Sequence, residues 1–267
     1  MEWKGLTAVI TGASSGFGRE AAKAFAAAGA TVIAVARREE KLMELVDELG
    51  GEPHSYVAMD LSELSGVRSM VDEVKSRTDH LDILMNNAGV ASNGPMKDAT
   101  SEDIEKLIKI NLLSAMWSTK EFLPLLDAAP KASRTPVVVN VASMAGRIPT
   151  PMNADYTASK FGLVGFTEAA WHEMQERQIR MMMLNPGLAD TEGFPMTEIK
   201  KNPMVGWTVM DDSRVVRALV NGIERGAFEV RVQWWMHPLY VTTVMMGPLR
   251  RLVSGAVRQK VGYRGKL

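Results

Sequence analysis

The sequence predicts an α/β protein: a single doubly wound domain in which helices cover both faces of a seven-stranded parallel sheet. Short apolar runs alternate with longer segments of helical periodicity, the pattern of strands that are buried on both faces. The length of 267 residues, with 46% hydrophobic and 23% charged residues, fits one large domain better than two small ones. No internal repeat or low-complexity segment interrupts this alternation.

Each strand is predicted from a short β-rich run, and each helix from the longer segment between two such runs. The predicted strands are 6–11, 31–36, 54–58, 83–86, 137–141, 179–184 and 228–232. The predicted helices include 18–28, 39–49, 64–77, 102–126, 156–177 and 212–224. Segment 128–136 holds two prolines and is interpreted as a connecting loop, because the alternation resumes beyond it.

The composition excludes several classes of function. The formal net charge is +0, with 31 basic and 31 acidic residues, so no global field attracts nucleic acid or a membrane surface. The absence of cysteine removes disulfides, thiolate catalysis and cysteine-ligated metal, and no metal site is expected. The first predicted strand leaves too little room for a signal peptide, and no run of about twenty apolar residues occurs. We therefore expect a cytoplasmic protein.

A glycine-rich turn follows the first predicted strand and precedes an alanine-rich helix. It reads Thr11-Gly12-Ala13-Ser14-Ser15-Gly16-Phe17-Gly18. Glycine allows close approach of a ligand, and the amides of a helix N-terminus attract a pyrophosphate. The same residues would also suit a purely structural turn, but their place after the first strand favours dinucleotide binding.

The end of the second predicted strand indicates which dinucleotide is bound. An NAD site places an acidic residue there, whereas this chain has Arg37 and Arg38. Two guanidinium groups suit the 2′-phosphate of NADP(H), and Arg37 is the better candidate. The alternative is that both arginines form a solvated entry to the helix that starts with Glu39 and Glu40.

Tyr156 and Lys160 are four residues apart, which on a helix places a phenol and an ammonium on one face. A cation beside a phenol favours the phenolate, so we expect Lys160 to lower the pKa of Tyr156 and make it a proton donor and acceptor. By themselves these two residues would equally fit a solvated helical face.

Taken together, these positions resemble the short-chain dehydrogenase/reductase family, over segment 6–232. The residues that carry the resemblance occur in the family's order, most of them at predicted strand ends and some in predicted helices: Thr11, Gly12, Gly16, Gly18, Asp60, Asn86, Asn87, Ala88, Gly89, Asn111, Ser143, Tyr156, Lys160, Pro186 and Gly187. The resemblance implies a Rossmann-type domain. Carboxyl ends of parallel strands are also where open α/β sheets bind ligands.

The resemblance implies a role for four catalytic residues. Tyr156 would be the general acid for carbonyl reduction, or the base for alcohol oxidation. Lys160 would lower the pKa of Tyr156 and hold the nicotinamide ribose. Ser143 would donate a hydrogen bond to the substrate oxygen, and Asn111 would hold a water that links Lys160 to solvent.

It also implies a set of cofactor contacts along the chain. They are Gly12, Ser14, Ser15, Gly16, Phe17, Gly18, Arg37, Arg38, Asp60, Leu61, Asn87, Ala88, Gly89, Tyr156, Lys160, Pro186, Gly187, Leu188 and Thr191. Asp60 would meet the adenine and Pro186 to Leu188 would border the nicotinamide. Asp60 would serve equally as a cap for the following helix.

Segment 188–210 lies where this family has a mobile substrate lid. Its apolar residues, and those of the loop between Ser143 and Tyr156, suit a fairly apolar carbonyl compound, although core packing explains such residues as well. They are Phe194, Met196, Ile199, Met204, Val205, Trp207 and Met210 in the lid, and Met144, Ile148, Pro149 and Met152 in the loop. Arg147 and Asn153 are the polar exceptions and are candidates to orient a substrate.

The predicted catalytic domain covers residues 1–237, and residues 238–267 form an extension of it. The extension has an apolar run, 238–249, and a tail with six basic and no acidic residues. It would cap the substrate pocket, pack against a second subunit, or contact an anionic membrane surface peripherally. A homo-oligomer is expected, with a dimer favoured. His237 has no partner cluster and is interpreted as structural.

The sequence thus predicts an NADP(H)-dependent oxidoreductase that interconverts a ketone or aldehyde and an alcohol on a fairly apolar small molecule. Two alternatives use the same fold: an epimerase or dehydratase, and a non-catalytic NADP(H)-binding sensor. Such sensors usually lack the intact serine, tyrosine and lysine set, whereas Ser143, Tyr156 and Lys160 are all present.

Overall fold

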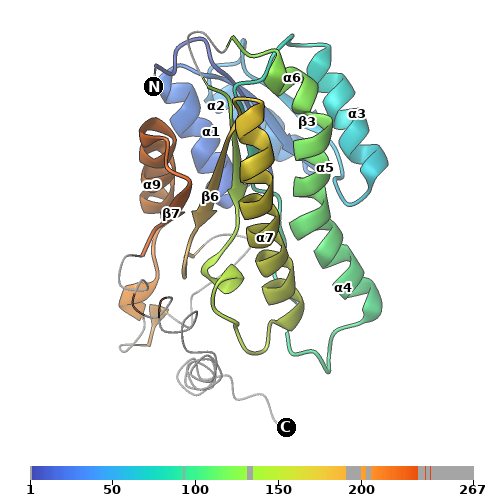
Figure 1. Cartoon of the computed structure of the whole chain (residues 1–267), viewed down its shortest axis with the longest axis vertical. Coiled ribbons are helices and arrows are strands. Elements are labelled where there is room, and N and C mark those ends of the chain that lie inside the picture. The colour runs from blue at the N-terminus through green and yellow to red at the C-terminus, as the bar shows by residue number, and fades with distance from the viewer. Residues whose placement is uncertain are drawn as a thin grey trace.

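A seven-stranded parallel sheet in the order β3-β2-β1-β4-β5-β6-β7 forms the centre of the protein (Figure 1). The computed structural model describes residues 2–92, 94–130, 135–190, 200–202 and 206–233, together with Pro238 and Val241. The strands are β1 (Thr7–Thr11), β2 (Thr31–Ala36), β3 (Ser55–Ala58), β4 (Ile83–Asn86), β5 (Val137–Val141), β6 (Arg180–Asn185) and β7 (Glu229–Arg231). All seven predicted strands are confirmed, with bounds that differ by at most one residue at either end.

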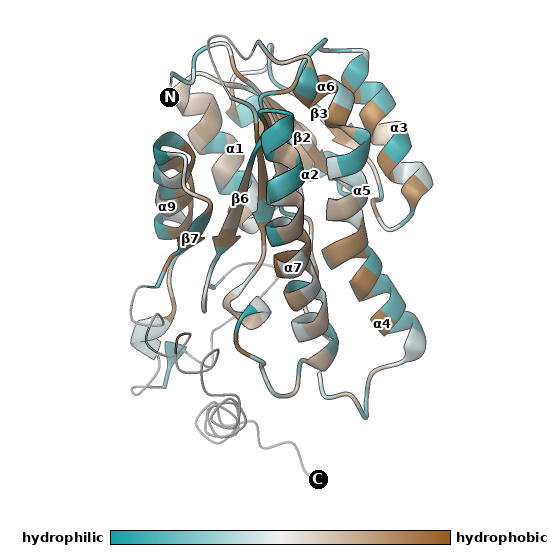
Figure 2. Ribbon diagram, in the orientation of Figure 1, coloured by the Kyte–Doolittle hydropathy of each residue, from teal (hydrophilic) through white to brown (hydrophobic). Residues whose placement is uncertain are grey.

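Helices cover both faces of the sheet, and two buried clusters separate the layers. One cluster packs α1 (Gly16–Ala28), α2 (Glu39–Glu48) and α9 (Asp212–Arg225) on one face. The other packs α3 (Leu64–Lys75), the segment 122–126 and α7 (Ala154–Glu176) on the opposite face. Figure 2 shows brown strands between helices whose turns alternate between brown and teal. This pattern is the doubly wound architecture that the sequence predicts.

The segment predicted as one helix, 102–126, is helical but is not a single regular α-helix. The segment consists of α4 (Ser101–Ile108), a π-helical turn η1 (Lys109–Leu113), α5 (Ser114–Glu121) and α6 (Leu123–Asp127). The wide turn η1 inserts an extra residue into the helical ladder, and π-turns of this kind often occur at functional sites. Pro124 stands in the first turn of α6, where its missing amide proton is tolerated.

The sheet has a topological switch point between β1 and β4. From β1 the chain moves outward to β2 and β3, then returns to β4 on the other side of β1 and continues to β7. In open parallel sheets, ligands bind beside the carboxyl ends of the strands at such a point. The glycine-rich turn after β1 and the segment after β4 therefore lie where a ligand site is expected.

Several sequence predictions lie outside the described residues. They are Thr191, most of the proposed lid, including Phe194, Met196, Ile199, Met204 and Val205, His237, and nearly all of the extension 238–267. In the described part of the chain, no helix has both the length and the apolar character required to cross a bilayer.

Candidate active site

The segments that follow β1, β4, β5 and β6 meet at one end of the sheet. Hydrogen bonds join them in pairs. Thr11 Oγ1, at the end of β1, accepts from the amides of Asn87 and Ala88 after β4, both at 3.0 Å. The amide of Met144, after β5, donates to the carbonyl oxygen of Pro186, after β6, at 2.8 Å. The sheet therefore brings together four of the predicted ligand-binding segments.

The glycines of the first turn are required by close packing. Gly12 has a φ of 69° and Gly16 a φ of 55°, which side chains disfavour. A Cβ on Gly12 would lie 2.9 Å from the Cα of Ala88, and a Cβ on Gly18 would lie 2.5 Å from Asn87 Nδ2. The turn thus lies directly against the segment after β4, and there is no space for side chains at these two positions.

The N-terminus of α1 receives no side-chain cap. Thr100 caps α4 and Asp211 caps α9, each through a hydrogen bond to a backbone amide of the first turn. Ser15, at the corresponding position of α1, makes no such bond, and the first turn of α1 has no acidic residue. The amides and positive dipole end of α1 therefore suit an anionic ligand such as a pyrophosphate.

The two arginines after β2 differ in their surroundings. Arg38 donates from Nη2 to Ser14 Oγ at 3.0 Å and to Ser15 Oγ at 2.7 Å, and from Nε to Ser14 Oγ at 3.2 Å. Arg37 is exposed and lies close enough to Asp60 to contribute to lowering its pKa. Arg38 therefore braces the glycine-rich turn, and Arg37 remains at the surface beside it.

Asp60 forms a local turn and does not cap the next helix. Its Oδ1 accepts from the amide of Ser62 at 2.9 Å, while the residue at the N-cap of α3 is Glu63. Burial opposes the ionised form of Asp60, but this hydrogen bond and the charge of Arg37 hold its pKa below the usual value. Leu61 beside it is buried. The sequence alternative of a helix cap is not what the structure shows.

Ser143, Tyr156 and Lys160 converge at the carboxyl end of β5. The hydroxyl groups of Tyr156 and Ser143 are hydrogen-bonded. Lys160 Nζ lies 5.7 Å from the centroid of the Tyr156 ring and donates to the carbonyl oxygen of Val141 at 2.9 Å. Lys160 is buried, so Tyr156 and Lys160 do not form the solvated helical face that the sequence left open.

Burial changes the pKa values of both residues. It raises the pKa of Tyr156 to about 12, against a smaller opposing effect of the hydrogen bond with Ser143. It lowers the pKa of Lys160 to about 8. The expected lowering of the Tyr156 pKa by Lys160 is therefore not seen, because desolvation of the phenol is the dominant effect.

Asn111 lies in the π-helical turn η1 and connects two segments of the site. Its Oδ1 accepts from the amide of Val90 at 2.8 Å, and its Nδ2 donates to the Val90 carbonyl at 3.0 Å and to Ser159 Oγ at 3.3 Å. A Cβ on Gly89 would lie 3.4 Å from Asn111 Oδ1 and 3.8 Å from Lys160 Nζ. Gly89 therefore lies between the amide and the ammonium.

A buried polar ladder attaches α7 to the sheet. Asn86 Nδ2 donates to Asn140 Oδ1 at 2.9 Å, and Asn140 Nδ2 donates to Thr167 Oγ1 at 2.9 Å. Both asparagines are buried, so these bonds are protected from competition with water. The ladder fixes the helix that carries Tyr156 and Lys160 relative to β4 and β5.

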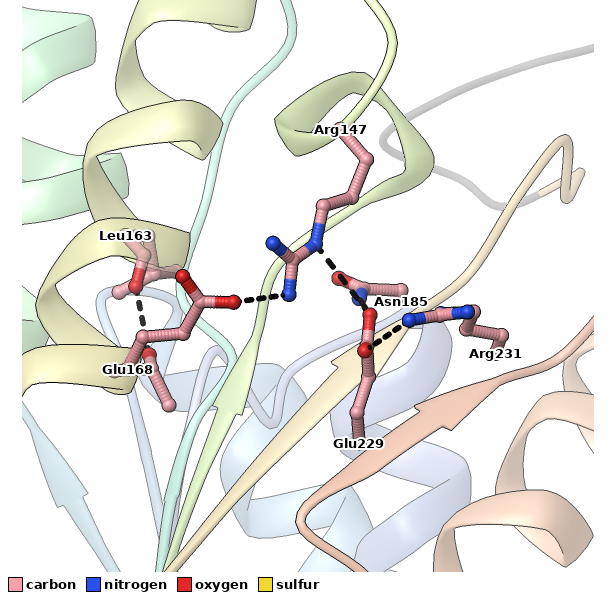
Figure 3. A network of polar contacts seen from close by, with 7 residues as sticks. Arg147, Leu163, Glu168, Asn185, Glu229 and Arg231 are labelled. Atoms are coloured by element: carbon pink, nitrogen blue, oxygen red, sulfur yellow. Dashed lines mark hydrogen bonds and ion pairs between the residues drawn. The ribbon is translucent and has the colours of Figure 1, made fainter. Parts of the chain in front are cut away.

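The loop after Ser143 packs toward β7. Met144, Arg147 and Ile148 line a small cavity of about 30 Å³ together with Asn185, Glu229, Arg231 and Gln233. Arg147 pairs with Glu168 at 2.6 Å and with Glu229 at 3.5 Å (Figure 3). The sequence proposed Arg147 as a residue that orients a substrate, but its guanidinium is held by two carboxylates of the protein.

Glu229 is the centre of this network, and sequence reasoning did not single it out. It accepts from Asn185 Nδ2 at 2.6 Å and pairs with Arg231 at 2.5 Å, as Figure 3 shows. The signal that was available is the pair of charged residues at 229 and 231 in the last predicted strand. Alternate residues of a strand share one face, so the side chains of Glu229 and Arg231 point toward the same side of β7.

We expect Glu229→Gln to destabilise the protein by about 1–3 kcal/mol at neutral pH, because it leaves two arginines facing an amide. Burial alone would raise the pKa of Glu229, but Arg231, Arg147 and Asn185 hold it below its usual value. The stabilisation is therefore present above the unfolded-state pKa and is lost as pH falls through the folded-state pKa. Urea unfolding of the wild type and the variant at neutral and acidic pH would measure their free energies of unfolding. We expect the difference between the two to be smaller at acidic pH.

Glu168→Gln is the matched control, because Glu168 also pairs with Arg147 but its side chain is 46% exposed. Exposed pairs contribute about 0–1 kcal/mol. The central role of Glu229 would be contradicted if the two variants lost the same free energy of unfolding. It would also be contradicted if the loss in Glu229→Gln did not change with pH.

Among the residues that the structure describes, no group of three or more histidine, aspartate or glutamate side chains could hold a metal ion.

Comparison with known proteins gives one consistent family. A model of the short chain dehydrogenase family matches residues 6–201. A short chain dehydrogenase of Pseudocercospora fijiensis is 34% identical over 194 residues, which are 71% of this chain and 61% of that relative. This chain therefore spans less than two thirds of that relative's length.

Two solved structures show the same fold and include nicotinamide cofactors. The 3-ketoacyl-(acyl-carrier-protein) reductase of Brucella melitensis, complexed with NADH, has 28% identity and a TM-score of 0.77, covering 86% of this chain and 98% of that chain. A metagenomic short-chain oxidoreductase in complex with NADP has 27% identity and a TM-score of 0.71, covering 86% and 99%.

Proposed function

The chain belongs to the short-chain dehydrogenase/reductase family, and we propose that it is an NADP(H)-dependent oxidoreductase that interconverts a ketone or aldehyde and an alcohol. The observation that carries this proposal is the convergence of the Ser143 and Tyr156 hydroxyl groups with the buried Lys160 ammonium at the end of β5. These groups can hold a substrate oxygen and transfer a proton to it.

The residues present fit a dinucleotide. The glycine-rich turn has no space for side chains at Gly12 and Gly18, and the uncapped N-terminus of α1 suits the pyrophosphate. Arg37 and Arg38 would hold the 2′-phosphate, and Pro186 to Leu188 would border the nicotinamide. When bound, the cofactor supplies the hydride.

The pKa values suit Tyr156 to the role of general acid in carbonyl reduction. A pKa of about 12 keeps the Tyr156 phenol protonated at neutral pH, the state in which it can give a proton to the substrate oxygen. The Ser143 hydroxyl donates a hydrogen bond to the same oxygen as negative charge develops there. Lys160, with a pKa of about 8, retains its charge at neutral pH and stabilises the phenolate that remains.

The described residues around the site suit a fairly apolar small molecule. Trp207 is 68% exposed, and Met210, three residues further, is buried and forms a parallel bridge with Ala189 after β6. An exposed indole can contact an apolar substrate without loss of core packing. We place this protein in the cytoplasm. We favour a homodimer, because apolar side chains on α5 and α7, such as Trp117, Phe166 and Trp171, are only partly buried.

The direct experiment is a screen of aldehydes, ketones and alcohols of graded size and polarity, followed by nicotinamide absorbance with both cofactors. We expect consumption of NADPH with apolar or aromatic carbonyl compounds, and weaker activity with NADH. Consumption only with compact, charged substrates would contradict the apolar pocket. Binding of NADPH without turnover of any carbonyl would favour the sensor alternative.

A further inference from the structure

Gln233, two residues beyond β7, lies in the interior next to the segment that follows β6. Its side chain is 5% exposed. Its Nε2 donates to the carbonyl oxygen of Leu188 at 3.2 Å and to that of Thr208 at 3.2 Å. One amide group therefore bridges two backbone segments that are twenty residues apart in the sequence.

The two bridged segments already run side by side. The amide of Met210 donates to the Leu188 carbonyl at 2.9 Å, and the amide of Asp190 donates to the Met210 carbonyl at 3.2 Å. Ala189 and Met210 form a parallel bridge. Gln233 adds a third connection at Thr208, which is itself buried. These contacts fix the start and the return of the segment that contains the proposed lid.

The amide group of Gln233 lies directly against Gly187. Gly187 does not have a left-handed backbone. A Cβ at this position would instead lie 2.5 Å from Gln233 Cδ and would overlap with Oε1. A side chain at position 187 would therefore displace the end of the Gln233 side chain from its two hydrogen bonds.

The chemistry of the contact requires an amide. Two carbonyl oxygens face the same nitrogen, so the group at that position must have two protons to donate. Glutamate has the same shape, but its carboxylate would place a negative oxygen against two acceptors. An apolar residue would leave both carbonyls without this donor. Glutamine donates to both carbonyl oxygens from one nitrogen, while its buried Oε1 has no hydrogen-bond partner among the described residues.

We infer that Gln233 is a positioning residue for cofactor binding, which sets the Pro186 to Leu188 segment against the nicotinamide and couples it to the returning segment at Thr208 and Met210. This inference rests on the proposed function, because it concerns the affinity for NADP(H). Its neighbours on β7 support it. Glu229 of β7 binds Asn185 at the end of β6, and Gln233, beyond β7, binds Leu188 in the segment that follows β6.

The test is the dissociation constant of NADP⁺, measured by calorimetry for the full chain and for Gln233→Glu. At about pH 8.5 we expect the variant to bind about tenfold more weakly, because two hydrogen bonds are replaced by repulsion. At about pH 6 the dissociation constant of the variant should be closer to that of wild type, because burial favours the protonated carboxyl, which can donate one hydrogen bond. Gln175→Glu, at an exposed position of α7, is the control and should bind as wild type does.

A second set of variants tests the contact with Gly187. Gly187→Ala is expected to weaken NADP⁺ binding, and Gln233→Ala should remove most of that penalty in the double variant, because the Cβ would then have space. Gln233→Leu should have a smaller effect than Gln233→Glu. The inference would be overturned if the losses of NADP⁺ affinity in the two single variants simply added in the double variant. It would also be overturned if the dissociation constant of Gln233→Glu stayed within about twofold of the wild-type value at both pH values. Failure of the wild-type protein to bind NADP⁺ would instead contradict the proposed function.

Discussion

Tyr156→Phe should lower kcat by a factor of roughly 10²–10⁴ and leave the dissociation constant of NADPH within about twofold of wild type. The substitution removes one oxygen and keeps the ring, so the packing around Ser143 and Lys160 is preserved. The phenol is the group that can give a proton to the substrate oxygen, and with a pKa of about 12 it holds that proton at neutral pH. Steady-state kinetics and a fluorescence titration of NADPH would measure the two quantities separately.

Tyr56→Phe is the matched control. It removes the same atom from a tyrosine on β3, whose hydroxyl bonds Glu39 Oε1 at 3.2 Å and is remote from the strand end that carries Ser143. We expect its kcat to be close to that of wild type. Turnover by Tyr156→Phe at the wild-type rate would exclude the proposed proton transfer, whatever the substrate is.

Arg37→Asp should weaken NADPH binding by about 100-fold and change NADH binding by less than about threefold. The reason is that a carboxylate would repel the 2′-phosphate, which NADH lacks. Arg37 is exposed beside the glycine-rich turn, so the substitution disturbs no buried contact. Titration of NADPH and NADH against the wild type and Arg37→Asp gives the change in dissociation constant for each cofactor.

Arg38→Asp should behave differently. Arg38 is bonded to Ser14 and Ser15, so its loss should weaken the binding of both cofactors, with NADPH affected more strongly. Arg217→Asp makes the same charge change at an exposed position of α9 and serves as the control. Equal losses of NADPH and NADH affinity in Arg37→Asp would remove the 2′-phosphate interpretation.

The strands and most helices could be predicted because their signals are local. A strand buried on both faces must be apolar throughout, and helices that cover it must have one apolar stripe, so both patterns are visible in the chain. The break in 102–126 could not be predicted in this way. The segment has the periodicity of one helix, and the wide turn at η1 is stabilised by contacts of Asn111 with Val90 and Ser159, which are distant in sequence.

The candidate site likewise has features that could be predicted from the sequence and features that could not. The glycine spacing, Ser143 and the pair of Tyr156 and Lys160 could be found from the sequence, because each has a fixed spacing or a fixed place after a strand. The pKa values could not be found, since they depend on burial. The sequence placed a cation beside a phenol and suggested a lowered pKa, whereas desolvation in the folded protein raises it to about 12.

By itself, then, the sequence determined the α/β class, the order of the strands along the chain, the glycine-rich turn and the residues of the proposed proton transfer. Only the tertiary structure decided that Arg38 braces Ser14 and Ser15, that Arg147 is held by Glu168 and Glu229, and that Gln233 lies against Gly187. The physical reason is the separation in sequence of the residues that interact. Local patterns fix which elements form, whereas hydrogen bonds between residues far apart in the chain, and the burial that shifts a pKa, exist only after those elements have packed.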